Sequence, residues 1–132
     1  MNKICTSVEQ SKKLIELGID VNTADMHYST WTILNGEYIL SPNQGETIEE
    51  LQEDYGNQVI PAWSLTALLD MLDYEVVDAE GESCYLKIDK DDIEYQIRYE
   101  DRWNSGIETK WYDNLLDAAF EMILKLKEKG LL

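Results

Sequence analysis

Histidine and paired carboxylates are the residues of this sequence that could take part in acid–base chemistry. His27 is the single histidine among 132 residues, so a Ser-His-Asp or Cys-His arrangement would have to use it. It lies close to Asp25, at the start of a predicted strand, and no recognisable nucleophile motif accompanies it. We interpret His27 as a structural or surface histidine, and a small enzyme using His27 is kept as an alternative hypothesis.

Neighbouring acids such as Asp91 and Asp92 are compatible with acid–base or glycosidase chemistry. The sequence contains 27 acidic residues, however, so such pairs are expected by chance. A calcium-binding loop starting at Asp89 is excluded because Ile93 occupies position 5 and Glu94 replaces the glycine at position 6. Dinucleotide, Walker-type, HExxH and kinase motifs do not occur. We therefore predict no catalytic residues and no cofactor, and lean against an enzyme.

The two cysteines give no support for a disulfide framework or a metal site. Cys5 and Cys84 lie far apart and match no CxxC or zinc-ligand spacing. Cys84 alternates with Leu86 and Ile88, which predicts a small residue of the core.

Acidic residues are distributed unevenly along the chain. Residues 14–86 contain 15 of the 27 acids and no Lys or Arg, within a formal net charge of −16. Binding to nucleic acid phosphates needs clustered Lys and Arg, so direct DNA or RNA binding is not expected, and attachment to anionic membranes is disfavoured likewise. The acidity fits a solvated surface that aids solubility, or a face that docks on a basic protein by imitating DNA phosphates.

Two places are candidates for partner binding. Residues 45–56, GETIEELQEDYG, fit either a short surface helix or a mobile acidic loop. Trp103 lies in a predicted turn between Arg102 and Asn104 and is the tryptophan expected to be exposed, whereas Trp111 is expected in the core. The acidic candidates are Glu49, Glu50, Glu53 and Asp54.

Helices and strands that position these residues follow from periodicity and turn chemistry. A capping box at Thr6 or Ser7 starts an N-terminal helix that ends at Gly18. Residues 27–34 and 37–40 flank Asn35-Gly36, which predicts a β-hairpin. A central helix spans residues 64–72. Trp63 and Leu68 occupy the two positions of a hydrophobic staple around the N-cap Ser64, which gives Trp63 a structural role.

The pattern of apolar residues in the second half of the sequence predicts a three-stranded meander followed by a long helix. Residues 84–89, 93–100 and 107–112 alternate like three strands, with Ile93 and Ile97 facing the same way. Residues 114–129 form a C-terminal helix with acids early and lysines late. We predict a single domain, residues 1–132, of the α+β class. One antiparallel sheet would combine the hairpin with the meander, with the N-terminal, central and C-terminal helices packed on one face. Without a signal peptide or an apolar run of membrane length, a cytoplasmic location is expected.

Four blocks of this sequence carry a family resemblance. TSVEQSKKL, TADMHY, IPAWSLTALLDML and YDNLLDAAFEMILKL occur in this order across nearly the whole chain. Together they resemble a family of small uncharacterised proteins encoded by prophages, conjugative transposons and other mobile elements of gut anaerobes. The resemblance implies a cytoplasmic, phage-related accessory protein and brings no activity and no functional residues.

Three functions remain open at this point. The leading hypothesis is a non-enzymatic accessory protein that acts through protein–protein interaction with an unknown partner, and a basic protein is the candidate partner. The first alternative is an acidic nucleic-acid mimic that inhibits a host DNA-binding protein. The second is the small enzyme that uses His27.

Overall fold

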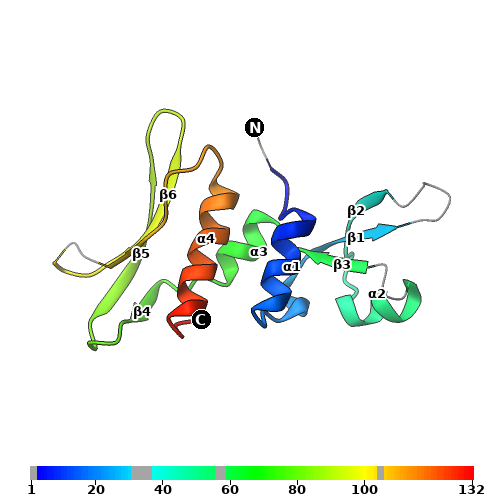
Figure 1. Cartoon of the computed structure of the whole chain (residues 1–132), viewed down its shortest axis with the longest axis horizontal. Coiled ribbons are helices and arrows are strands. Elements are labelled where there is room, and N and C mark those ends of the chain that lie inside the picture. Colours follow the sequence, from blue (N-terminus) through cyan, green and yellow to red (C-terminus); the bar gives the residue numbers. More distant parts are fainter. Residues whose placement is uncertain (1–2, 31–36, 56–58, 104–105) are drawn as a thin grey trace. The chain divides into compact units, whose positions relative to one another are not determined.

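The computed structural model describes residues 3–30, 37–55, 59–103 and 106–132. The described chain forms two compact units, Cys5–Ala67 and Met1–Ile4 with Leu68–Leu132, here named the N-terminal unit and the C-terminal unit. Figure 1 shows helices and antiparallel strands in both. The assignment of one domain to the whole chain stays a prediction.

The N-terminal unit begins with the predicted capped helix. In α1 (Val8–Glu16) the Ser7 hydroxyl accepts from the Gln10 N–H at 3.1 Å, and the Gln10 side chain accepts from the Ser7 N–H at 3.0 Å. Gly18, with φ 84°, follows the C-cap Leu17 and lets the chain leave the helix in a left-handed conformation. The 3-10 helix η1 (Val21–Thr23) follows.

Three antiparallel strands form the sheet of this unit. The central strand β1 (Met26–Thr30) pairs with β2 (Tyr38–Pro42) on one side and with β3 (Val59–Ala62) on the other. The predicted hairpin is therefore present as β1 and β2, while its Asn35-Gly36 turn lies outside the described residues. β3 is absent from the sequence prediction because Pro61 favoured a helix entry, yet proline is tolerated on an outer strand.

Trp63 joins this sheet to the start of α1. Its ring is fully buried. The backbone N–H of Trp63 donates to the Thr6 hydroxyl at 3.1 Å, and the backbone carbonyl of Trp63 accepts from the Thr6 N–H at 2.9 Å. The indole Nε1–H donates to Thr23 Oγ1 at 2.8 Å. Ser64 caps α3 (Leu65–Asp70) by accepting from the Ala67 N–H at 3.2 Å, as predicted. Trp63 is thus a structural residue.

The C-terminal unit contains a four-stranded antiparallel sheet in the order β4-β5-β6-β7. Its strands are β4 (Glu75–Val77), β5 (Ser83–Lys90), β6 (Tyr95–Glu100) and β7 (Gly106–Glu108). The predicted C-terminal helix, α4 (Leu115–Glu128), packs against β6 and covers one side of the sheet in Figure 1. Asn114 caps α4, since its side chain accepts from the Asp117 N–H at 2.8 Å.

The predicted α+β class with antiparallel strands is confirmed, but its strands belong to two sheets instead of one. The predicted hairpin, β1 and β2, forms one sheet together with β3. The predicted meander, β5 to β7, forms the other sheet together with β4. Alternation along a strand fixes which side chains share a face and leaves open which distant strand pairs with it. This is why the sequence pattern could not separate the two sheets.

The predicted core position of Trp111 and the predicted strand position of Ile93 are both wrong. Trp111 is 41% exposed and Ile93 is 74% exposed. β7 ends at Glu108, so the alternation that would have turned Trp111 inward does not continue. Ile93 lies in the turn before β6, where its N–H donates to Asp91 Oδ1 at 3.0 Å.

Candidate functional site

Residues 48–55 are a helix, which settles the alternative between helix and acidic loop. α2 (Ile48–Tyr55) begins where Thr47 Oγ1 accepts from the Glu50 N–H at 3.1 Å. Ile48 is fully buried and Leu51 is 5% exposed, and α2 packs against β3. These two apolar residues attach the helix to its unit, so its acidic side chains face solvent.

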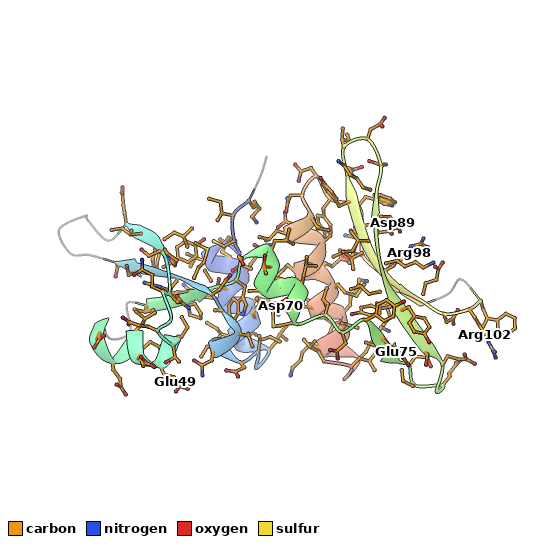
Figure 2. The ribbon with its side chains drawn as sticks, turned by 180° about the vertical axis from the view of Figure 1, so that it is seen from behind. Glu49, Asp70, Glu75, Asp89, Arg98 and Arg102 are labelled. Carbon is orange, nitrogen blue, oxygen red and sulfur yellow. The ribbon has the colours of Figure 1, made fainter. Side chains whose placement is uncertain are left out.

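The acidic face of α2 consists of Glu49, Glu50, Glu53 and Asp54, all of them exposed. Figure 2 shows Glu49 on the outer side of the helix, where its carboxylate accepts a hydrogen bond from Asn22 at 3.4 Å. No ion pair involves these four carboxylates within the described residues. Glu49 lies four residues before Glu53, and Glu50 four before Asp54, so like charges repel along the helix.

The whole N-terminal unit shares this charge. Residues 5–67 contain ten acidic side chains and two basic ones, Lys12 and Lys13. Both lysines lie on α1, and Lys13 is 3.9 Å from a carboxylate oxygen of Glu16. The acidic face of α2 therefore belongs to a unit that has little positive charge to neutralise it.

Trp103 is exposed, as predicted, but belongs to the C-terminal unit. Its side chain is 68% exposed, and the Arg102 guanidinium lies 4.9 Å from the centre of a Trp103 ring. The Trp103 N–H donates to Asp101 Oδ1 at 2.8 Å, which holds the turn. Trp103 therefore lies in one unit, and the acidic face of α2 lies in the other.

His27 is buried and oriented by a side chain that the sequence prediction missed. It is 7% exposed, and its Nδ1 lies 2.8 Å from Asn43 Oδ1. The amide of Asn43 is itself fixed, because its Nδ2 donates to the Ala24 carbonyl at 3.0 Å. Asp25, the acid nearest in sequence, binds the N–H and the hydroxyl of Ser64 instead.

A hollow of about 400 Å³, here named the His27 pocket, opens beside this imidazole. His27 is directly opposite Ser41 in the pairing of β1 with β2, and Ser29 follows two residues along β1, so all three share one face of the sheet. Beyond His27 itself, the pocket is lined by Ser29, Ile39, Ser41, Pro42, Asn43, Gln44, Glu46 and Leu51. No local sequence signal joins Asn43 to His27, since strand register sets that contact.

Charged residues on the sheet of the C-terminal unit neutralise one another. Glu100, 8% exposed, accepts from Lys87 at 2.5 Å and from Arg98 at 3.0 Å. The Arg98 guanidinium also donates to Asp89 at 2.6 Å, and this hydrogen bond raises the pKa of Arg98 above its ordinary value. Figure 2 shows Asp89 and Arg98 side by side on β5 and β6. These carboxylates already have cationic partners, whereas those of α2 have none in the part of the chain that the structure describes.

Cys84 is a core residue, as predicted. It is 1% exposed, and burial, together with the nearby carboxylates of Asp78, Asp101 and Glu82, raises the pKa of its thiol. It lines a hollow of about 540 Å³ that also contains Lys129. A thiol whose pKa is raised stays protonated at neutral pH and is a poor nucleophile.

Comparisons with known proteins give no family for this chain. No protein-family model, curated protein or solved structure matches it significantly. Among the described residues, no group of three or more His, Cys, Asp or Glu side chains is arranged to hold a metal ion. None of the helices in the described part of the chain combines the length and the apolar character needed to cross a bilayer.

Proposed function

We propose that this chain is a non-enzymatic accessory protein that binds a basic protein partner through the acidic face of α2. The supporting observation is a contrast between carboxylates. Asp89 and Glu100 are paired with cations of their own sheet, whereas the four carboxylates of α2 are exposed and have no cationic partner among the described residues. Unpaired charges of one sign on a fixed helix attract a partner of the opposite sign.

The geometry of α2 supports a specific contact over a merely solubilising one. Ile48 and Leu51 anchor the helix, so the backbone positions that carry its acidic side chains are fixed relative to one another. Two pairs of acids at a spacing of four residues each destabilise an isolated helix by about 0.2–0.5 kcal/mol. A basic surface placed against α2 would remove this repulsion and gain the Coulomb attraction.

A cytoplasmic location and a role in a phage or other mobile element complete this proposal. They rest on the four sequence blocks that resemble mobile-element proteins.

The test is affinity capture from host lysate with the tagged protein, followed by measurement of binding to the captured partner at increasing salt. We expect saturable binding that weakens as salt rises, because screening acts over about 8–10 Å at physiological ionic strength. The variant carrying Glu49→Gln, Glu50→Gln, Glu53→Gln and Asp54→Asn should lose most of this binding.

A matched control neutralises four exposed acids of the C-terminal unit: Glu80, Asp92, Asp113 and Glu128. It changes the net charge by the same amount and should retain binding. If both variants lost binding equally, the binding would depend only on net charge, and this result would contradict a specific role of α2. Binding that ignores salt would contradict the electrostatic mechanism.

Imitation of nucleic acid is the narrower form of the proposal, in which the basic partner is a host DNA-binding protein. The observation in its favour is that the acidic face of α2 belongs to a unit with ten acids and two bases. Duplex DNA should then compete with this protein for the partner, because both would occupy the same basic surface. Simultaneous binding of DNA and this protein to the partner would contradict it.

A further inference from the structure

We propose that the His27 pocket binds an organic cation with N–H donors, namely an ammonium or guanidinium group on a short carbon chain. This site is separate from the acidic face of α2, and the inference does not depend on the proposed protein partner. It rests on the orientation of His27, on the acceptors around it and on the local charge.

His27 presents one free ring nitrogen to the pocket. Asn43 Nδ2 donates to the Ala24 carbonyl, so its Oδ1 faces His27 and accepts the hydrogen on Nδ1. In the neutral imidazole, Nε2 is then the acceptor. The structure records no hydrogen bond for Nε2, and no described side-chain nitrogen or oxygen is both buried and without a partner. Nε2 is therefore accessible, and the hollow beside the ring gives that access.

The other polar side chains of the pocket are suited to accept hydrogen bonds from a ligand. The hydroxyls of Ser29 and Ser41 lie on the His27 face of the sheet, and Glu46 contributes a carboxylate. Ile39 and Leu51 add apolar surface for a short carbon chain. A ligand with several N–H donors and a small apolar part matches this lining.

Local charge selects a cation over an anion. The pocket lining contains Glu46 and no Lys or Arg, and no Lys or Arg occurs anywhere in residues 14–86. An anionic ligand would meet the acidic N-terminal unit without a countercharge, whereas an ammonium or guanidinium group would be attracted. A charge-assisted hydrogen bond to Glu46 would add to the affinity.

His27 also makes the test selective, because it is the only histidine of the chain. Its imidazole Cε1–H signal can be followed by NMR in the full-length protein while butylammonium or ethylguanidinium is added at constant ionic strength. We expect a saturable shift with both cations and none with butyrate or butanol, which match butylammonium in size. The absence of a saturable shift with either cation would overturn the proposal, and so would an equal response to butyrate.

Two variants separate a specific contact from diffuse attraction. Glu46→Gln removes the carboxylate of the pocket and should weaken butylammonium binding about tenfold, the loss expected for one charge-assisted hydrogen bond. Glu9→Gln removes the same charge from exposed α1, outside the pocket lining, and should leave binding unchanged. Equal effects of the two variants would contradict the site. Both residues are exposed, so the variants are expected to fold, which circular dichroism checks.

The source of the cation is decided by a further comparison of ligands. N-acetyl-lysinamide presents its ammonium group as a protein side chain does, while butylammonium represents a free amine. Tighter binding of N-acetyl-lysinamide would assign the pocket to a lysine of a protein, and tighter binding of butylammonium would assign it to a small metabolite. A negative result in the partner-binding test of α2 would not change the cation-binding results, because the four carboxylates of α2 do not line the His27 pocket.

Discussion

Individual side chains in this protein show how burial and hydrogen bonding decide the role of an aromatic residue. Trp63 and Trp103 are the same amino acid, but the first is fully buried and bonded to Thr6 and Thr23, while the second is 68% exposed. The helix-start chemistry around Ser64 predicted the structural role of Trp63 from the sequence. Its bond to Thr23 could not be predicted, because it joins residues 40 positions apart.

Trp63→Ala should lower the free energy of unfolding by roughly 3–4 kcal/mol, because it leaves a large cavity and removes the indole hydrogen bond to Thr23. Urea unfolding followed by circular dichroism measures this change. Trp103→Ala is the control and should change stability by less than about 0.5 kcal/mol. Similar losses in both variants would contradict the assigned roles.

The raised pKa of Tyr99 predicts how the free energy of unfolding depends on pH in the alkaline range. Its hydroxyl donates to the Asp73 carbonyl at 2.5 Å, and burial, with a smaller effect of the Asp73 charge, raises its pKa from 10.0 to about 12. The folded protein therefore keeps this proton where the unfolded chain has lost it. The stabilisation is complete below pH 10 and is lost as pH rises through about 12.

Tyr99→Phe removes this titration. Between pH 10 and 12 the unfolding free energy of the variant should decline less steeply than that of the wild type, by about 1.4 kcal/mol per pH unit. At neutral pH the variant should be less stable by about 1 kcal/mol, because the hydrogen bond to Asp73 is lost. Denaturant unfolding at several alkaline pH values compares the slopes, and identical slopes would show that Tyr99 does not cause this decline.

At the scale of elements, helix ends were easier to predict than strand partners. The capping box of α1 and the start of α4 near Asn114 appear where the sequence placed them, since helix starts are decided by residues a few positions apart. β3 escaped prediction because it is short and pairs with the distant strand β1. β4 escaped prediction because it has only three residues, although its partner β5 follows soon after it. The same limit hid the contact between Asn43 and His27, and with it the His27 pocket.

The pairing of β5 with β6 carries a prediction about its charged residues. Glu100→Gln leaves Lys87 and Arg98 without the carboxylate that they share, and should lower the unfolding free energy by about 2 kcal/mol. Glu108→Gln, on the neighbouring strand β7 but exposed, should cost less than about 0.5 kcal/mol. Thermal and urea unfolding compare the two, and equal costs would contradict a special role for Glu100.

At the scale of the molecule, net charge and its distribution dominate. The chain has a formal net charge of −16, and the N-terminal unit contains ten acids for two bases. The sequence alone established this imbalance. Which carboxylates are neutralised by neighbours and which stay unpaired required the structure, because ion pairs depend on strand register.

Self-repulsion should make the protein more stable at higher ionic strength. Raising sodium chloride from about 0.01 M to about 0.5 M shortens the screening length from about 30 Å to a few ångström and should raise the unfolding free energy by about 1 kcal/mol. The variant with four neutralised carboxylates on α2 should gain less. Urea unfolding at each salt concentration measures the gain, and a gain of equal size in both proteins would contradict a contribution from α2.

The position of Pro61 has a consequence for aggregation. Among the described strands, β3 pairs with β1 on one side only, and an unpaired strand edge can receive a strand from another molecule. Directly after β3, Trp63 bonds to Thr6 of the same unit. Proline has no N–H, and within a paired strand its nitrogen is tolerated only where it points away from the ladder. Pro61 therefore removes a donor from the outer edge of β3 and is itself fully buried, which makes β3 a poor template for the intermolecular strand addition that leads to fibrils.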